Sequence, residues 1–193
     1  MRSKCEKCNY PTSTCICEAI SSVIVPIKVI IIQHVKESAN AKNTARLIKL
    51  CANDVEIIPT DSISEMATLA SRCNVQSTAL LYPSDNSIAL ESQREHIASS
   101  LQTLLVIDGS WKQAYAVLQQ FPWLSSIPSF HFEHAPSTQY RIRHTRIRAG
   151  LSTLEATAYT LNTLYNIDTQ PFIKLQEAMQ ENWRGPKAHQ RET

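Results

Sequence analysis

The chain has 193 residues, of which 43% are hydrophobic, and a formal net charge of +2. These values suit one domain with a small appendage, and they exclude a strongly basic nucleic-acid-binding protein unless the basic residues cluster. No apolar run approaches the about 20 residues that a membrane-spanning helix needs. Residues 1–5 lack the apolar segment of a signal peptide, so we expect a cytoplasmic chain whose thiols are reduced.

The three glycines stand at Gly109, Gly150 and Gly185. This spacing cannot form a G-x-G-x-x-G motif or a P-loop. The sequence therefore argues against a dinucleotide-binding fold, a P-loop enzyme and a glycine-rich Rossmann methyltransferase.

Residues 1–19 predict a separate unit because they hold four cysteines in the pattern Cys5-x2-Cys8-x6-Cys15-x-Cys17. The segment has little apolar content of its own, and a Zn²⁺ ion held by four thiolates would stabilise its fold. Four thiolates complete the coordination shell, so we expect a structural zinc site. Reduced or redox-active thiols are the alternative.

From residue 20 to residue 193 the sequence alternates between strand and helix patterns. The expected strands are 23–33, 55–58, 78–82 and 104–107, with a small edge strand at 128–132. The expected helices are 43–52, 62–72, 91–101, 112–120, 152–165 and 171–183. Such alternation predicts an α/β fold with a mainly parallel sheet and helices on both faces.

Some of these helices carry informative local patterns. Ser62 and Ser152 are each followed by a glutamate three residues later, which is a capping-box pattern at a helix start. In the helix that begins near Trp111, this residue, Tyr115 and Leu118 lie on one stripe.

The stretch 104–111 combines a buried strand with a polar turn. Four apolar residues predict a strand buried on both faces, and Asp108-Gly109-Ser110 ends it before the next helix. Open α/β sheets place their chemistry at the carboxyl ends of parallel strands, so Asp108 is a candidate functional residue. The alternative is a tight turn in which Asp108 or Ser110 only caps the helix.

Two further strand ends carry polar or aromatic residues. His34 follows the first strand, and Tyr82-Pro83-Ser84 ends the third. If these strands are neighbours of the strand that ends at Asp108, the three ends form one crevice. A histidine there can bind a ligand or transfer a proton, although a single histidine is more often a hydrogen-bonded loop residue.

The segment 140–148 is rich in arginine, because Arg141, Arg143, Arg146 and Arg148 stand within eight residues. Each guanidinium can bind a phosphate through two N–H groups, so the segment suits an RNA backbone. A solvated, salt-bridged loop is the alternative. The segment leads to a capped helix start, where the amides around residues 151–154 can hold a carboxylate or a phosphate.

Together these stretches resemble the DTW-domain family, named for an Asp-x-Thr-Trp signature. Here the signature stands as Asp108-Gly109-Ser110-Trp111, and the serine retains the hydroxyl of threonine. The other family motifs follow in the family's order and span nearly the whole chain: the four cysteines, Gln33-His34 with Glu37, and residues 43–46, 82–84, 140–143 and 151–156.

The resemblance implies a tRNA-uridine aminocarboxypropyltransferase. Such enzymes move the 3-amino-3-carboxypropyl group of S-adenosylmethionine to N3 of a uridine, forming acp3U and releasing 5′-methylthioadenosine, and bacterial members act on the variable loop. The family is also related to SPOUT-type folds, so the resemblance implies a SPOUT-like, knotted DTW domain over residues 20–193. Two alternatives remain, a SPOUT-like RNA methyltransferase with the same donor and a non-enzymatic zinc-containing RNA-binding protein.

The resemblance also implies a set of site residues. Asp108 would remove or orient the proton on uridine N3, and Ser110 would position the uracil. The donor would bind at strand ends and at a helix start, through Leu81, Tyr82, Pro83, Ser84, Ile107, Gly109, Trp111, Leu151, Ser152 and Thr153. Of these, Ser152 and Thr153 would hold its carboxylate. The tRNA would bind His34, Arg141, Arg143, Arg146 and Arg148.

Overall fold

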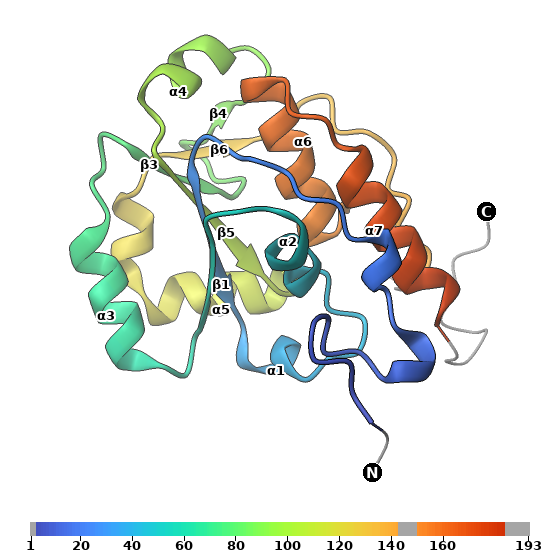
Figure 1. The fold of residues 1–193 in the computed structure, drawn as a ribbon. Helices are drawn as coiled ribbons and strands as arrows, with labels where there is room; N and C mark the ends of the chain where they lie inside the picture. Colours follow the sequence, from blue (N-terminus) through green and yellow to red (C-terminus); the bar gives the residue numbers. More distant parts are fainter. Residues whose placement is uncertain (1–2, 143–149, 184–193) are drawn as a thin grey trace.

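A central sheet of six strands organises the structure, a computed structural model that describes residues 3–142 and 150–183 (Figure 1). The strands are β1 (Lys28–Gln33), β2 (Val55–Pro59), β3 (Thr78–Leu81), β4 (Ile88–Ala89), β5 (Thr103–Asp108) and β6 (Ser129–His131). Their order in the sheet is β2-β1-β5-β3-β6-β4, and every neighbouring pair is parallel. The predicted α/β fold with a parallel sheet is confirmed.

The described residues form seven α-helices, which cover both faces of the sheet as predicted (Figure 1). They are α1 (Val35–Ser38), α2 (Ala45–Cys51), α3 (Ile63–Arg72), α4 (Arg94–Ser100), α5 (Trp111–Gln120), α6 (Thr153–Tyr165) and α7 (Gln170–Glu181). Helices α2, α6 and α7 pack together on one face, and α3 and α5 lie on the other. Short 3-10 helices occupy Thr12–Thr14, Cys17–Ala19 and Pro122–Ser126. None of these helices is long and apolar enough to span a membrane.

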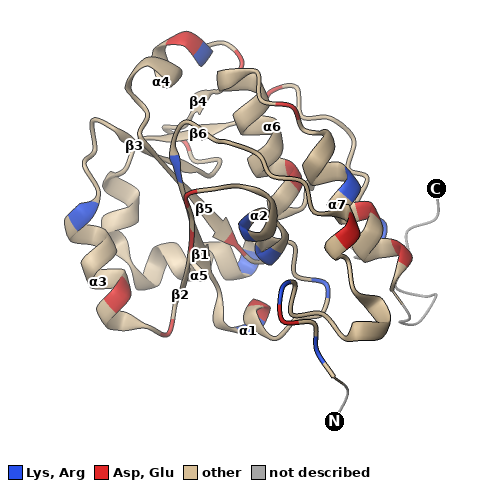
Figure 2. Ribbon diagram, viewed as in Figure 1, with Lys and Arg blue, Asp and Glu red and all other residues tan. Residues whose placement is uncertain are grey.

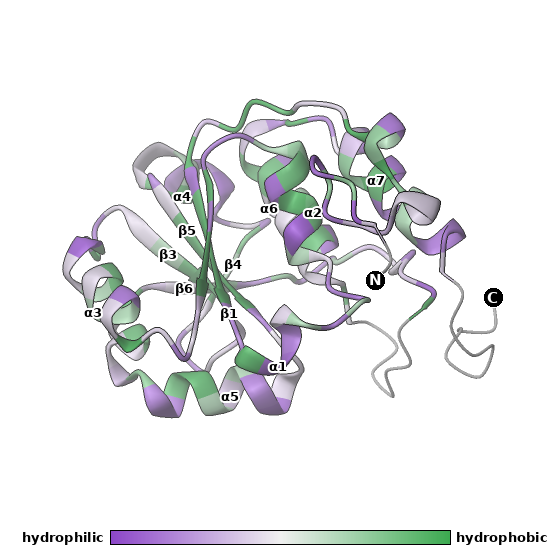
Figure 3. Ribbon diagram, turned by 60° about the horizontal axis from the view of Figure 1, so that its bottom comes forward, coloured by the Kyte–Doolittle hydropathy of each residue, from purple (hydrophilic) through white to green (hydrophobic). Residues whose placement is uncertain are grey.

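Strand β1 shows why a continuous apolar run forms a strand here. Successive side chains point to opposite faces, so both faces of a covered strand need apolar residues. Ile31 packs in one core cluster with Leu47 of α2, and Ile32 packs in the opposite cluster with Met66 of α3. All four side chains are fully buried, and each such burial contributes about 1.5–3 kcal/mol. Figure 3 shows the hydrophobic strands between the two helix layers.

Two of the predicted strands differ from the structure. The first strand begins at Lys28 rather than at residue 23, because Pro26 has no N–H for a ladder and Val23 makes only an isolated bridge to Ala52. The strand predicted at 128–132 forms β6, but the expectation that it lies at the edge is wrong. The two-residue strand β4 pairs with its outer side and occupies the edge instead.

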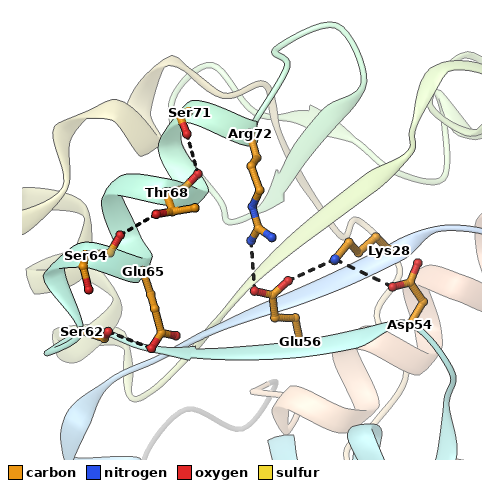
Figure 4. Close-up of polar contacts among 9 residues, drawn as sticks. All are labelled: Lys28, Asp54, Glu56, Ser62, Ser64, Glu65, Thr68, Ser71 and Arg72. Atoms are coloured by element: carbon orange, nitrogen blue, oxygen red, sulfur yellow. Dashed lines mark hydrogen bonds and ion pairs between the residues drawn. The ribbon is translucent and has the colours of Figure 1, made fainter.

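The opposite edge of the sheet is protected by charge (Figure 4). Glu56 of β2 accepts a hydrogen bond from Arg72 of α3 at 3.0 Å and forms an ion pair with Lys28 of β1 at 3.1 Å. Burial alone would raise the pKa of Glu56, but these two cations outweigh it and lower the pKa. Charged side chains on an edge strand disfavour pairing with a second chain, so β2 can remain an open edge.

The two predicted capping boxes form to different extents. At α6 the box is complete, because Ser152 Oγ accepts from the Glu155 N–H at 3.2 Å and the Glu155 carboxylate accepts from the Ser152 N–H at 2.7 Å. At α3 the Ser62 hydroxyl instead donates to the Glu65 carboxylate at 3.0 Å (Figure 4). The helix α3 therefore starts at the predicted place without the backbone hydrogen bonds of a capping box.

Candidate active site at the carboxyl edge of the sheet

The carboxylate of Asp108 is a buried junction between separate parts of the chain. Asp108 ends β5 and is 2% exposed. Its Oδ2 accepts hydrogen bonds from Gln33 Nε2 of β1 at 3.0 Å and from Asn43 Nδ2 at 2.6 Å. Its Oδ1 accepts from the hydroxyl of Thr153, the first residue of α6, at 2.6 Å. A buried carboxylate without such donors would be strongly destabilising, so these contacts hold β1, β5, α6 and the residues before α2 in fixed relative positions.

The helix after β5 is capped by Ser110 and not by Asp108. Ser110 Oγ accepts from the Gln113 N–H at 3.4 Å, and Gln113 Oε1 accepts from the Ser110 N–H at 2.6 Å. The capping alternative therefore holds for Ser110, and its predicted catalytic role stays a prediction. Gly109, between Asp108 and Ser110, lies in a tight space, because a Cβ atom there would stand 3.0 Å from Gln113 Cβ and 3.6 Å from His34 Cβ.

The three strand ends that were expected to meet do lie on neighbouring strands. β1, β5 and β3 are consecutive in the sheet, and Gln33 is in register with Asp108. At the end of β1, the His34 N–H donates to the Asp108 carbonyl oxygen at 3.0 Å. At the end of β3, the Tyr82 ring lies 6.2 Å from the Trp111 ring, centroid to centroid. The predicted site residues at these ends therefore gather at one edge of the sheet.

The His34 side chain has a structural partner in this arrangement. Its Nδ1 accepts from the Lys36 N–H at 3.2 Å and thereby caps α1. This is the hydrogen-bonded loop residue that we gave as the alternative to a functional histidine. Its predicted contact with RNA stays a prediction.

The start of α6 lies beside Asp108, but its two hydroxyl side chains bind protein groups. Ser152 is 4% exposed, and its hydroxyl donates to Gln176 Oε1 of α7 at 2.7 Å. The Thr153 hydroxyl donates to Asp108, as described above. The half-buried Leu151 immediately precedes them. The backbone N–H groups of Ser152 and Glu155 are bonded within the capping box, and that of Leu154 donates to Thr44 Oγ1 at 3.4 Å, so a ligand carboxylate that binds these N–H groups would have to replace one of these partners.

Two residues that position Asp108 belong to the family motifs but had no predicted role. Gln33 and Asn43 are 7% and 4% exposed, and both donate to the same carboxylate oxygen. Asn43 also accepts from the Arg46 N–H at 3.2 Å, which fixes its side chain at the start of α2. The available signal was polarity in an apolar setting, since Gln33 follows four consecutive apolar residues, 29–32, in strand β1.

The predicted arginine site is described only in part. Arg141 is exposed, and its N–H donates to Gln180 Oε1 of α7 at 2.5 Å. Arg143, Arg146 and Arg148 lie outside the described residues. Other basic residues lie on α2 and on the N-terminal segment, as Figure 2 shows.

The four N-terminal cysteines come together as predicted. Their sulfur atoms all lie within 4.8 Å of one another, with Cys5 Sγ 3.5 Å from Cys17 Sγ and Cys8 Sγ 3.7 Å from Cys15 Sγ. A tetrahedral site with Zn–S bonds of about 2.3 Å has sulfur–sulfur distances of about 3.8 Å, so this donor set fits Zn²⁺. All six cysteines in the chain are free.

The ionisation of this cluster also suits a cation. Backbone N–H groups of Cys8 and Lys7 and the Cys17 thiol lower the pKa of Cys5 to about 6. Burial and the neighbouring thiols raise the pKa of Cys17 to about 12. One thiolate forms readily, and further thiolates form beside it only if a positive ion compensates their charge.

These features define an α/β domain whose buried polar centre lies at the carboxyl edge of a parallel sheet, with a four-cysteine cluster at its N-terminus. The chain belongs to the DTW domain family, which matches residues 2–184. This confirms the resemblance that the sequence motifs indicated.

Curated relatives with a stated activity are similar to most of the chain. The chain is 31% identical to tRNA-uridine aminocarboxypropyltransferase 2 of Drosophila melanogaster over 170 residues. The aligned residues cover 84% of this chain and 67% of that protein. It is 28% identical over 172 residues to the proteins of the same name from Macaca fascicularis and Mus musculus, covering 84% of this chain and 57% of each relative. The chain thus spans little more than half the length of the two mammalian relatives. No solved structure matches the chain.

Proposed function

We propose that this protein transfers the 3-amino-3-carboxypropyl group of S-adenosylmethionine to N3 of a uridine in the variable loop of tRNA. The observation that carries the proposal is the buried Asp108 carboxylate, which stands within the family signature and is held by three hydrogen-bond donors at the carboxyl edge of the sheet. The names of the similar curated proteins support this reaction and its tRNA substrate.

The reaction requires one proton transfer and one displacement at carbon. The uridine N3–H bond breaks, N3 forms a bond to the γ-carbon of the transferred group, and the electron pair of the sulfur–carbon bond stays on sulfur in 5′-methylthioadenosine. The sulfonium supplies an activated carbon, so the protein mainly has to position the two reactants and handle the N3 proton.

We assign the proton to Asp108, either as the base that accepts it or as the acceptor that orients N3–H. The carboxylate already accepts three hydrogen bonds, so a uridine N3–H has to replace one of the donors. Thr153 is the donor that suits this exchange, because a hydroxyl rotates freely and can bond elsewhere. Ser110 at the adjacent helix start would position the uracil.

The other predicted residues surround this position on neighbouring elements. The adenosine of the donor would bind the ends of β3 and β5, at residues 81–84 and at Ile107, Gly109 and Trp111. Its amino acid part would bind the N-terminal end of α6, at residues 151–153. The parallel order β1-β5-β3, which brings these ends to one edge, supports the assignment.

The tRNA would bind cations around this edge. His34, Arg141, Arg143, Arg146 and Arg148 would contact the RNA, and the arginines would contact its phosphates. Cys5, Cys8, Cys15 and Cys17 would hold a structural zinc ion. The knot implied by the relation to SPOUT-type folds also remains part of this proposal.

Product analysis tests the reaction against its rivals. Metal-loaded protein is incubated with unmodified tRNA and S-adenosylmethionine carrying one label in its carboxyl carbon and another in its methyl group. We expect the carboxyl label in the tRNA, acp3U among its nucleosides, and 5′-methylthioadenosine in solution. S-Adenosylhomocysteine with a methylated tRNA would establish the methyltransferase instead. Tight tRNA binding without any transfer would establish a non-enzymatic RNA-binding protein.

Two aspartate variants locate the reaction on the protein. Asp108→Asn keeps the size of the side chain and removes its charge, so we expect transfer to fall by at least about a hundredfold while tRNA binding persists. Asp85→Asn is the matched control, because this aspartate is exposed just beyond the end of β3. Unchanged turnover in Asp108→Asn would remove Asp108 from the reaction.

A further inference from the structure

Helix α5 exposes its largest apolar residues and buries its smaller ones. Trp111 and Tyr115 are 49% and 60% exposed, whereas Ala114 and Val117 are buried against the sheet. A surface helix normally turns its large apolar side chains inward. The stripe that Trp111 and Tyr115 share with Leu118 is therefore mostly an outward face, with only Leu118 packed partly against the core.

The exposed rings lie beside the candidate active site. Trp111 comes three residues after Asp108, and its ring lies 6.2 Å from the Tyr82 ring at an interplanar angle of 59°. Tyr115 is one helical turn further along α5, and it is close enough to Tyr82 to raise the pKa of that phenol, after burial as the main cause. Tyr82, Trp111 and Tyr115 thus form one group, here called the aromatic rim, at the ends of β3 and β5.

The charges around the aromatic rim suit a polyanion. Residues 109–120 contain one charged residue, Lys112, and it is exposed. Lys36 of α1 is also exposed and follows the neighbouring strand β1, and the exposed Asp85, three residues after Tyr82, is the opposing charge. Aromatic faces next to cations are the combination that binds single-stranded nucleic acid, because the bases stack and the phosphates are neutralised.

The size of the aromatic rim argues against a second copy of the chain as its occupant. One aromatic side chain buries at most about 150–250 Å². Two exposed rings therefore fall well short of the about 800 Å² per partner that a stable protein interface buries. A single nucleobase, in contrast, needs only one or two ring faces.

We propose that Tyr115 is a stacking platform for a tRNA base next to the uridine that is modified, whereas Trp111 remains with the donor's adenosine. The proposal rests on the proposed function, since it takes tRNA as the substrate. A uridine has to leave its base stack before its N3 can approach Asp108, and its neighbour then loses a stacking partner. The face of Tyr115 replaces that partner and holds the strand in its opened form.

Tyrosine variants test the platform by direct binding of unmodified tRNA to the full chain, without the donor. Because alanine removes the ring on which the base stacks, we expect Tyr115→Ala to raise the dissociation constant for tRNA about tenfold. Tyr115→Phe keeps the ring and should bind like the wild type. Val75→Ala is the control, since Val75 is 48% exposed and lines a cavity of about 190 Å³ at the other end of β3.

Salt separates stacking from charge in the same assay. The loss in Tyr115→Ala should be the same factor at low and at high salt, because stacking releases no counterions. The loss in Lys112→Ala should shrink as the salt concentration rises. A Tyr115→Ala loss that disappears at high salt would overturn the platform.

Binding of 5′-methylthioadenosine identifies which base stacks there. We expect its dissociation constant to be unchanged in Tyr115→Ala, because Tyr115, unlike Tyr82 and Trp111, is not among the residues assigned to the donor's adenosine. A weaker affinity for 5′-methylthioadenosine with unchanged tRNA affinity would overturn the proposal. A wild-type chain that does not bind tRNA would instead refute the proposed function, so the two failures are distinguishable.

Discussion

The guanidinium of Arg46 lies over the ring of Tyr10, with its Cζ atom 3.9 Å from the ring centroid. Tyr10 stands between Cys8 and Cys15 in the N-terminal unit, and Arg46 belongs to α2. The backbone N–H of Arg46 donates to Asn43 Oδ1, and Asn43 Nδ2 in turn donates to the carboxylate of Asp108. A continuous series of contacts therefore joins the cysteine cluster to the candidate active site.

Removal of one cysteine should release the metal and destabilise the chain. We expect Cys8→Ser to lose one zinc ion per chain and to lower the melting temperature, because the remaining thiols cannot complete the tetrahedral shell. Metal analysis of the purified protein and thermal denaturation measure the two effects. Cys73→Ser is the control, since Cys73 lies outside the cluster and packs against the core beside α3. One zinc ion retained by Cys8→Ser would exclude the four-cysteine site.

The hydroxyl of Tyr10 should destabilise the fold at high pH. Burial raises the pKa of Tyr10, with the charge of Arg46 acting in the opposite direction, and the hydroxyl has no hydrogen-bond partner among the described residues. A raised pKa in the folded state means that this contribution to stability is complete below the ordinary tyrosine pKa of about 10 and is lost as the pH rises through the folded value.

The variant Tyr10→Phe isolates this effect, because it keeps the ring beneath Arg46 and removes the ionisable group. We expect the free energy of unfolding, measured with denaturant, to be at least that of the wild type at pH 7, because the unpaired buried hydroxyl is gone, and the difference to grow above pH about 10. Tyr10→Leu loses the ring face beneath Arg46, so its free energy of unfolding should be lower by about 1 kcal/mol or more, both at pH 7 and at high pH. Parallel pH profiles for wild type and Tyr10→Phe would contradict the assignment.

Much of the sheet could be predicted from the sequence because parallel strands that are buried on both faces consist of continuous apolar residues. Residues 104–107 are such a run, and the position of Asp108 at a strand end followed from it. Strand β4 has only two residues, Ile88 and Ala89, and its place depends on β6 rather than on a local pattern. Its existence was therefore not visible in the sequence.

The contacts of the site were less predictable than its position. Asn43 and Thr153 lie 65 and 45 positions from Asp108, and no local spacing indicates that their side chains meet its carboxylate. The stripe on α5 shows a second limit. Trp111 and Tyr115 have the spacing of a core-facing pair, but Ala114 and Val117 fill the narrow space against the sheet, so the large rings face outward.

The hydroxyl of Thr153 should matter for both stability and transfer. Thr153→Val keeps the shape of the side chain and leaves one oxygen of the buried Asp108 without its donor, so we expect a loss of about 1–3 kcal/mol in the free energy of unfolding. Thr153→Ser keeps the hydroxyl and should stay close to the wild type. Denaturant unfolding measures the loss, and 5′-methylthioadenosine release measures transfer. Equal stability of the two variants would show that the hydrogen bond to Asp108 contributes nothing.

Arg141 should contribute a phosphate contact to tRNA binding. The side chain is exposed, and its backbone N–H is fixed to Gln180 of α7. We expect Arg141→Ala to weaken tRNA binding and to reduce the slope of log K against log salt by about 1, because one phosphate contact and its released counterion are lost. Arg72→Ala is the matched control, since Arg72 pairs with Glu56 at the far edge of the sheet (Figure 4). If both variants change the slope equally, the effect comes from net charge, and Arg141 does not contact the RNA.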